Sequence, residues 1–400
     1  MLNYIREIST GFFVLIVAFN YSSFCIVATL LDVPQESNTF HIYSGVLATL
    51  VVILLFLSTR HIPNGMAITC LLLCAVITLL FFCTRFFYPE VNPYYNSYFL
   101  ALIARFIPSV LTGILMLSID DVLRKIGRAL LPFILLYTLG LVYVVFTCDI
   151  GVNVSMYNTG FLTYQSISYF SSFAAGLSMY LLTWYDDSYP RFWKCILRAL
   201  VITQILISLM GGGRGAFVLC CILALYFVWR QKTLNKKFSS VIFLLIILLV
   251  IYTLMLNNEN LTMGYERIFN FFGNNDKIET DGRWYRWGLA WDAFVGSPIF
   301  GHGLGSVFYE VGFYSHNIFT DMLCEGGVIL ITIFAFFIAK FIPALRKLVI
   351  IDQRNEIMGL IFIFSFVQLC FSGYYLSESG IWVSLTYIIC QNSLNSRLSL

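Results

Sequence analysis

A histidine followed by an asparagine, His316-Asn317, stands where a long polar stretch gives way to an apolar run of membrane-spanning length. An imidazole titrates near neutral pH, so His316 could take the proton from an attacking hydroxyl group while Asn317, Asp321 or Glu325 orients the ring. A histidine at the start of a helix can also be an ordinary interfacial residue. The residue types alone leave both interpretations open.

Three glycines precede Arg214, and a fourth, Gly215, follows it. The run Gly213-Arg214-Gly215 therefore predicts an unwound backbone, a helix start and a fixed cation at one point of the chain. Helix N-termini and guanidinium groups both bind phosphate, so the pattern favours an anion site that includes Gly213 and Gly215. The alternative is a bend between two spans, with an arginine that extends to water.

Two more arginines, Arg283 and Arg286, are three residues apart and would share one side of a helical turn. They could grip a phosphate group or a sugar, while Trp284 and Trp287 stack on sugar rings or anchor in the lipid headgroup region. Anchoring at the interface is a sufficient explanation for the same residues, and it remains the alternative to a binding site.

Arg105 lies inside an apolar segment expected to span the membrane at 98–119, a few residues below its outer end. A cation inside the membrane is costly and usually faces a partner or an aqueous cavity. We therefore include Arg105 among the candidate binding residues. The alternative is a side chain that extends to the nearby water interface.

The same sequence argues against several other kinds of chemistry. Neither His302 nor His316 has the cysteine, histidine or carboxylate spacing of a metal site, and no nucleotide-binding glycine loop is present. We therefore expect no metal and no cofactor. The two adjacent aspartate pairs lie in short turns beside basic residues, which disfavours an enzyme that uses a nucleotide-sugar donor. The eleven cysteines lie mostly in apolar runs and are interpreted as membrane-buried residues.

The elements that must position these residues are membrane helices. Of the 400 residues, 59% are hydrophobic and 11% charged, whereas soluble domains carry about 25% charged residues. A span needs roughly 20 apolar residues, and the first run is long enough to span rather than to be a removable signal peptide. We predict an all-α polytopic protein forming one integral domain, 1–400, with no affinity for nucleic acid. The expected spans are 11–31, 41–59, 65–83, 98–119, 129–147, 164–184, 195–211, 215–229, 239–256, 317–339, 356–372 and 375–391.

The placement of basic residues predicts the orientation of these spans. Lysine and arginine concentrate in alternate connections, which the positive-inside rule assigns to the cytoplasm together with both termini. Seven basic residues defy this bias and are expected on or near the outer side, where they indicate a need for positive charge: Arg85, Arg105, Arg214, Arg267, Lys277, Arg283 and Arg286.

The outer connection 257–316 is the one long polar segment of the chain. Within it, tryptophan and other apolar residues recur at helical spacing from Trp284 to Val295, which predicts an amphipathic helix lying at the membrane interface, in contact with lipid or with the helical bundle. Gly-Ser-Pro at 296–298 should end this helix. Gly301, Gly303 and Gly305 should then allow a tight turn.

Several short blocks together resemble a known family, the O-antigen polymerase and O-antigen ligase superfamily of bacterial inner-membrane glycosyltransferases. The blocks cover about a quarter of the chain and occur in the order found in the family. They are Gly213-Arg214-Gly215-Ala216, Gly282-Arg283 with Trp287, the run Pro298-Ile299-Phe300-Gly301-His302-Gly303-Leu304-Gly305, His316-Asn317 and Glu325-Gly326-Gly327.

The resemblance implies a GT-C-like helical fold whose active site lies on the periplasmic side. It also implies an undecaprenyl-pyrophosphate-linked oligosaccharide as substrate and a metal-independent, inverting transfer. By the same resemblance, Arg214 and Arg283 would hold the pyrophosphate, assisted by Arg105 or Arg286. His316 would act as the base or orient the acceptor. Membrane lipids, a chain-length regulator and a flippase of the same pathway would be further partners.

The resemblance covers both polymerases and ligases. The His-Asn-Ile-Phe start at 316–319, with a Gly-Gly turn in the next helix, favours the polymerase, which joins lipid-linked repeat units into a polysaccharide. The ligase, which transfers the glycan to lipid A-core, is the first alternative. A lipid-linked oligosaccharide flippase or other transporter is the second. A transporter predicts cations spread through several spans at mid-membrane, whereas here they cluster toward one face.

Overall fold

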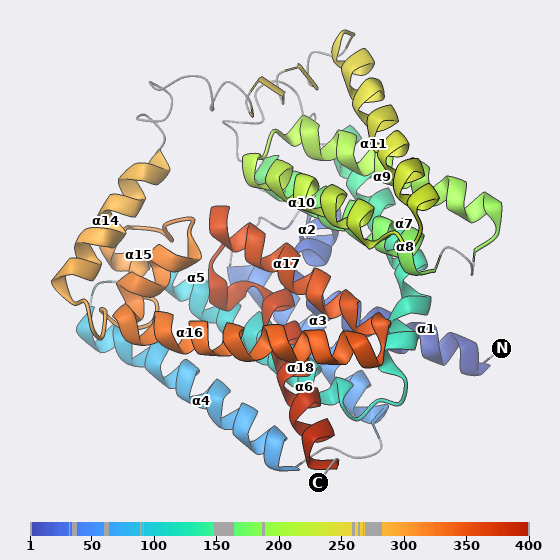
Figure 1. Cartoon of the computed structure of the whole chain (residues 1–400). Helices are drawn as coiled ribbons and strands as arrows, with labels where there is room; N and C mark the ends of the chain where they lie inside the picture. Colours follow the sequence, from blue (N-terminus) through green and yellow to red (C-terminus); the bar gives the residue numbers. More distant parts are fainter. Residues whose placement is uncertain are drawn as a thin grey trace. The chain divides into compact units, whose positions relative to one another are not determined.

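A computed structural model describes residues 2–31, 33, 38–59, 64–88, 90, 92–147, 164–185, 189–257, 261–262, 265–266, 268 and 282–398. Every regular element in these ranges is a helix (Figure 1). The prediction of an all-α polytopic membrane protein is therefore confirmed. Much of the predicted 257–316 connection, including Arg267 and Lys277, lies outside the described residues.

The chain divides into two compact units. Unit 1 comprises Met1–Tyr21, Glu36–Arg128 and Glu279–Leu400, and unit 2 comprises Ser22–Gln35 and Ala129–Ile278. A single integral domain over 1–400 stays a prediction.

Unit 1 is a bundle in which α18 packs against α6, α16 and α17, and α3 packs against the segment that joins α5 to α6. That segment is a turn of π-helix, Leu102–Phe106. The core contains large side chains that are fully buried, among them Phe81, Phe106, Phe308 and Tyr374. The helices are α1 (Leu2–Ala18), α3 (Asn38–Leu57), α4 (Asn64–Phe87), α5 (Pro93–Ala101), α6 (Ile107–Met116), α14 (Gly282–Gly296), α15 (Val307–Glu310), α16 (Ile318–Ile351), α17 (Glu356–Phe371) and α18 (Ser379–Leu398).

Unit 2 is organised around α8, which packs against both α9 and α10, while α11 packs on α10. Polar side chains join these helices inside the unit: Gln204 of α9 donates to the Thr138 hydroxyl of α7 at 2.6 Å. The helices are α7 (Val122–Thr147), whose first seven residues belong to unit 1, α8 (Tyr164–Trp184), α9 (Arg191–Gly211), α10 (Arg214–Arg230) and α11 (Leu234–Met255), with α2 (Asn20–Leu30) at the boundary of the units.

Each of the twelve predicted spans overlaps one or more helices, but not every helix has the length and apolarity of a complete span. Among the described residues, eight helices qualify, or nine if the bent pair α1 and α2 counts as one. Helix α10 has 17 residues, about 26 Å at ~1.5 Å per residue, which is shorter than the roughly 30 Å of hydrocarbon. The span predicted at 11–31 is not one straight helix, because α1 and α2 meet there at 90°.

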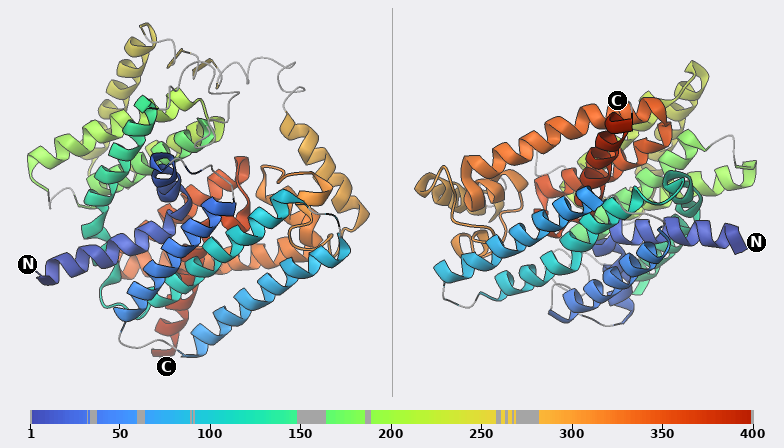
Figure 2. Two further views of the ribbon diagram at one scale, coloured as in Figure 1. Left: turned by 180° about the vertical axis from the view of Figure 1, so that it is seen from behind. Right: turned by 90° about the horizontal axis from the view of Figure 1, so that it is seen from below.

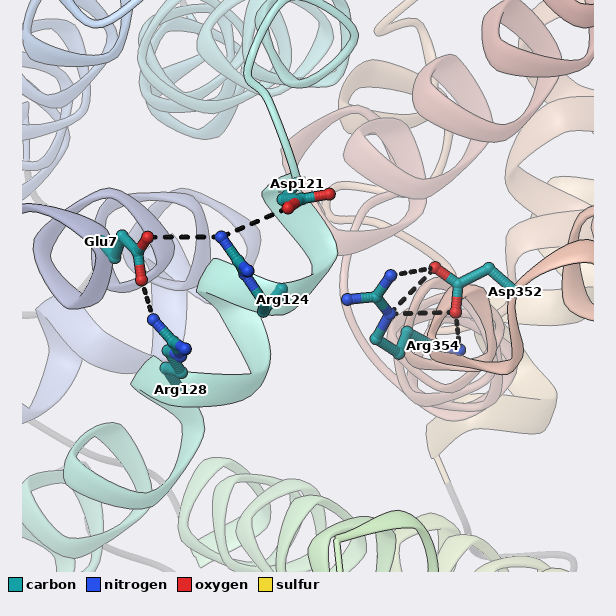
Figure 3. Close-up of polar contacts among 6 residues, drawn as sticks. All are labelled: Glu7, Asp121, Arg124, Arg128, Asp352 and Arg354. Atoms are coloured by element: carbon teal, nitrogen blue, oxygen red, sulfur yellow. Dashed lines mark hydrogen bonds and ion pairs between the residues drawn. The ribbon is translucent and has the colours of Figure 1, made fainter. Parts of the chain in front are cut away.

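Ion pairs join α1 to the start of α7 within unit 1 (Figure 3). Glu7 accepts from Arg124 at 3.3 Å and from Arg128, and Arg124 also lies 3.2 Å from Asp121. A similar pair, Arg354 with Asp352 at 2.8 Å, closes the turn between α16 and α17. These pairs are partly exposed, so each contributes at most about 1 kcal/mol.

The loop after α14 is held in a kink of α16. Gly327 has a φ of 57° and a ψ of −152°, which interrupts the helix and leaves backbone groups for the loop. The Gly303 amide donates to the Glu325 carbonyl at 2.8 Å, and the Val328 amide donates to the Pro298 carbonyl at 2.9 Å. As predicted, α14 ends at Gly296, and the glycines at 301, 303 and 305 all have positive φ.

Candidate functional site

All the predicted site residues of unit 1 except Arg105 gather where α14, the loop after it and the first turn of α16 meet. Helix α14 packs against α16, with Ala290 and Ala293 as its buried residues, and α15 contacts the start of α5. Figures 1 and 2 show this group of elements at one end of α16. Small residues on α14 let it lie close to α16, which brings its arginines to the helix start.

Arg286 and His316 are in direct contact. The guanidinium Nη1 lies 2.7 Å from the imidazole Nε2, and the guanidinium carbon lies 5.3 Å from the centre of the Phe313 ring. Because a guanidinium only donates, His316 accepts at Nε2 and is neutral in this arrangement, with its proton on Nδ1. His316 also has a φ of 67°, a left-handed backbone conformation that is uncommon for a residue with a side chain.

The residues expected to orient the imidazole have other partners. Asn317 caps α16 by accepting from the Phe319 amide at 2.9 Å. The fully buried Asp321 accepts from the Ser315 amide at 2.8 Å, so it fixes the backbone just before the histidine. Arg286, rather than Asn317 or Asp321, is therefore the hydrogen-bond partner of the His316 ring at Nε2.

The Glu325 carboxyl group accepts hydrogen bonds from two tyrosines that the sequence did not identify as site residues. Tyr374 donates to its carboxyl oxygens at 2.9 and 3.0 Å, and Tyr375 donates at 2.6 Å. Burial raises the pKa of both phenols well above the ordinary value, so both keep their protons and remain donors. The sequence signal that could have identified them is a pair of adjacent tyrosines in a short turn between two apolar helices.

Arg283 lies on α14, three residues before Arg286, and is half-buried. The neighbouring Trp284 and Trp287 rings pack together with their centres 4.8 Å apart. Trp284 is 50% exposed and Trp291 is 53% exposed, so α14 turns aromatic residues outward from unit 1, as expected of an amphipathic helix. That this surface contacts lipid stays a prediction.

Arg105 lies nearer the middle of its helical segment than predicted. The continuous helical segment runs over Pro93–Met116, so Arg105 is about 18 Å from its start at ~1.5 Å per residue, near the middle. The side chain is only 2% exposed and does not extend to an interface. Its Nη2 lies 2.9 Å from His41 Nδ1, and its guanidinium carbon lies 4.5 Å from the centre of the Tyr21 ring. Arg105 is farther from the start of the helix than predicted, because the helix begins five residues earlier than the apolar run.

A row of aromatic rings connects this buried pair to His316. The His41 ring centre is 6.3 Å from that of Tyr98, Tyr98 is 5.8 Å from Tyr314, and Tyr314 is 4.5 Å from His316. Arg105 therefore lies behind the site and reaches it through packed side chains. Its predicted role in substrate binding stays a prediction.

Arg214 lies in unit 2, with the local geometry that the glycine run predicted. Helix α9 ends at Gly211, Gly212 has a left-handed φ of 65°, and α10 begins at Arg214 after Gly213. The Gly213 amide donates to the Ser168 hydroxyl at 3.1 Å, and a Cβ at Gly213 would lie 2.8 Å from Ser168 Cβ. Gly213 and Gly215 are buried, and Arg214 is half-buried at the helix start.

His302 is part of the loop structure, as its glycine neighbours suggested. Its Nε2 lies 2.8 Å from the Ala293 carbonyl oxygen, and its Nδ1 lies 3.8 Å from a Glu310 carboxyl oxygen. Glu310 in turn accepts from the Tyr88 hydroxyl, whose pKa is raised by burial. Within the described ranges, no three histidine, cysteine or carboxylate side chains gather as a metal site would require.

The fold and the site define a helical integral membrane protein that presents paired arginines and a histidine at one end of unit 1. Residues 199–335, about a third of the chain, match a protein family described as O-antigen ligase. This segment contains Arg214, Arg283, Arg286 and His316, and the match confirms the resemblance to the O-antigen polymerase and ligase superfamily. The family implies an enzyme of the glycosyltransferase type that uses lipid-linked glycans. No curated protein matches the chain.

Proposed function

We propose that this protein is an O-antigen polymerase, which joins undecaprenyl-pyrophosphate-linked oligosaccharide units on the periplasmic face of the bacterial inner membrane. The observation that carries the proposal is the contact of 2.7 Å between Arg286 and His316, with Arg283 one helical turn away, inside the matched segment. This cluster places a base that can accept the proton of a hydroxyl group beside two cations that can bind a diphosphate.

In the proposed reaction, an acceptor hydroxyl attacks the anomeric carbon of the donor sugar and loses its proton to His316 Nε2. A new C–O bond forms at the anomeric carbon as the bond to the pyrophosphate oxygen breaks, and the lipid diphosphate leaves with the electron pair. A single displacement of this kind inverts the anomeric carbon. Arg283 and Arg286 stabilise the departing negative charge, as arginine clamps do for phosphoryl groups.

The contact between Arg286 and His316 links donor binding to activation of the base. In the structure, Arg286 occupies the nitrogen lone pair that a base would use. A diphosphate offers this guanidinium a stronger, charged acceptor. When Arg286 turns to the donor, Nε2 is released for the acceptor hydroxyl. This arrangement leaves Nε2 of the neutral His316 free to accept a proton only when a lipid-linked donor is in place.

Arg214 supplies a further cation in the same matched segment. We propose that it binds phosphate at the start of α10 together with backbone amides. The Gly213 amide is already used by Ser168, so the arginine side chain is the main contributor there.

O-antigen ligase is the second candidate, because the family match does not distinguish the two. The two candidates share the donor and the chemistry and differ in the acceptor. A strain lacking the gene distinguishes them. Lipopolysaccharide with one repeat unit on the core identifies the polymerase, and lipid-linked polymer beside bare core identifies the ligase.

Site variants in the same strain test the mechanism. Arg283→Ala, His316→Ala and Arg214→Ala should each abolish long-chain product while the protein remains in the membrane at normal levels. Arg346→Gln is the matched control, because this exposed arginine lies 28 residues after the first residue of α16 and beyond its kink at Gly327. Normal chain lengths with Arg283→Ala, at normal protein levels, would refute the proposed site.

A further inference from the structure

Tyr94 is an exposed aromatic residue at the start of α5 that the proposed reaction does not use. It is 46% exposed, although α5 packs against α15 within unit 1 (Figure 1). Asn92 fixes its backbone, because the Asn92 side-chain oxygen accepts from the Tyr94 amide at 2.9 Å. The side-chain nitrogen of Asn92 donates to the Phe308 carbonyl of α15 at 2.6 Å. The start of α5 is thereby tied to α15, and Tyr94 is presented at a defined position.

Ring contacts connect Tyr94 to the proposed base. The ring centres of Tyr94 and Phe313 are 4.8 Å apart with their planes at 76°, and Phe313 is 5.9 Å from the His316 ring. The guanidinium carbon of Arg286 lies 5.3 Å from the centre of the same Phe313 ring. Phe313 therefore contacts the base, a cation proposed to bind the donor diphosphate, and Tyr94. Tyr94 lies one ring beyond the groups that take part in the proposed reaction.

The chain beside these rings leaves space at the surface. Gly312 is exposed and has a φ of 79°, a conformation that glycine adopts without steric cost. A Cβ at Gly312 would have no atom within 4 Å, and the adjoining Phe313 is half-buried. A ligand whose reacting group lies at His316 could therefore extend over this part of the surface and contact the ring of Tyr94.

From these contacts we propose that Tyr94, supported by Phe313, binds a sugar ring of the acceptor glycan, an inference that rests on the proposed function. The C–H groups on one face of a sugar pack well against an aromatic ring, and the phenol hydroxyl can bond to sugar hydroxyl groups. The acceptor sugar that reacts lies at His316, and the next sugar of the same glycan lies on Tyr94. Because neither aromatic side chain is charged, this subsite selects a neutral sugar, whereas the arginines select the donor diphosphate.

The test measures transfer by the full-length protein from a lipid-linked donor whose own acceptor hydroxyl is chemically blocked, while the concentration of an unblocked acceptor glycan is varied. Tyr94→Leu keeps an apolar side chain and removes the ring. The energy of packing on an aromatic ring corresponds to about two- to tenfold in binding, so this variant should raise the acceptor KM by that factor. The donor KM and kcat should not change. Tyr94→Trp keeps a ring with a polar group and should retain the wild-type acceptor KM.

The matched control is Phe87→Leu, which removes an aromatic ring that is 78% exposed at the end of the neighbouring helix α4. It should leave the acceptor KM unchanged. An equal rise in both leucine variants would overturn the proposal, because exposed aromatic residues would then act by anchoring the protein at the membrane interface. A Tyr94→Leu variant with the wild-type acceptor KM, or with a lower kcat alone, would overturn the sugar subsite and leave the proposed function intact. Failure of the wild-type protein to transfer from any lipid-linked donor would refute the proposed function, and the subsite with it.

Discussion

Replacing Arg286 with glutamine tests the contact on which the proposed mechanism depends. The guanidinium and the His316 imidazole are 2.7 Å apart, at the short end of the range for charge-assisted hydrogen bonds. A hydrogen bond to a charged group contributes about 1.5–3 kcal/mol. If Arg286 makes a comparable bond to the leaving diphosphate, Arg286→Gln should slow transfer about 10- to 150-fold.

The assay is transfer by purified protein from a synthetic lipid-linked glycan, together with the lipopolysaccharide chain length in a complemented deletion strain. Arg286→Lys keeps the charge but loses the planar group that can bind a phosphate through two nitrogens, so it should recover only part of the rate. Arg346→Gln is again the control and should transfer at the wild-type rate.

A double-mutant cycle decides whether the two residues act together. Residues in direct contact usually show coupling energies of about 0.5–3 kcal/mol. The Arg286→Gln/His316→Ala variant should therefore be slowed by less than the product of the two single losses. Independent, multiplying losses would show that the contact has no part in the reaction, and a wild-type rate for Arg286→Gln would refute the reasoning as a whole.

Four further predictions concern stability and are checked by thermal unfolding of the purified protein. His41→Leu leaves the buried Arg105 without its 2.9 Å partner and should cost about 1–3 kcal/mol, whereas adding Arg105→Met should recover part of this loss; a further loss in the double variant would contradict it. Glu325→Ala deprives two buried phenols of their acceptor and should cost about 3 kcal/mol or more, and Glu325→Gln should cost less because one acceptor oxygen remains. Gly301→Ala should cost at least about 2 kcal/mol, because its φ is 64° and the new Cβ would lie 2.4 Å from the Glu325 carbonyl carbon. The helical Gly288 has nothing within 4 Å, so Gly288→Ala should instead stabilise by about 0.5–1 kcal/mol.

Much of the helical architecture could be predicted because a membrane helix is determined by one continuous run of apolar residues. A run of apolar residues must become a helix in lipid, since its backbone groups have no other partners there. The same local logic gave the end of α14 at Gly296 and the glycine turn at 301–305. It failed where a bend depends on packing, as at the 90° break between α1 and α2.

The sequence predicted which residues belong to the candidate site, but it did not predict which of them contact one another. The sequence itself determined that this is a helical membrane protein and that arginines and a histidine accompany its one long polar connection. Only the tertiary structure decided that Arg286 is the partner of His316, that Tyr374 and Tyr375 hold Glu325, and that Arg105 is buried beside His41. These pairs are separated by 30 to 64 positions along the chain, and local patterns of apolarity and charge carry no information about which distant side chains meet.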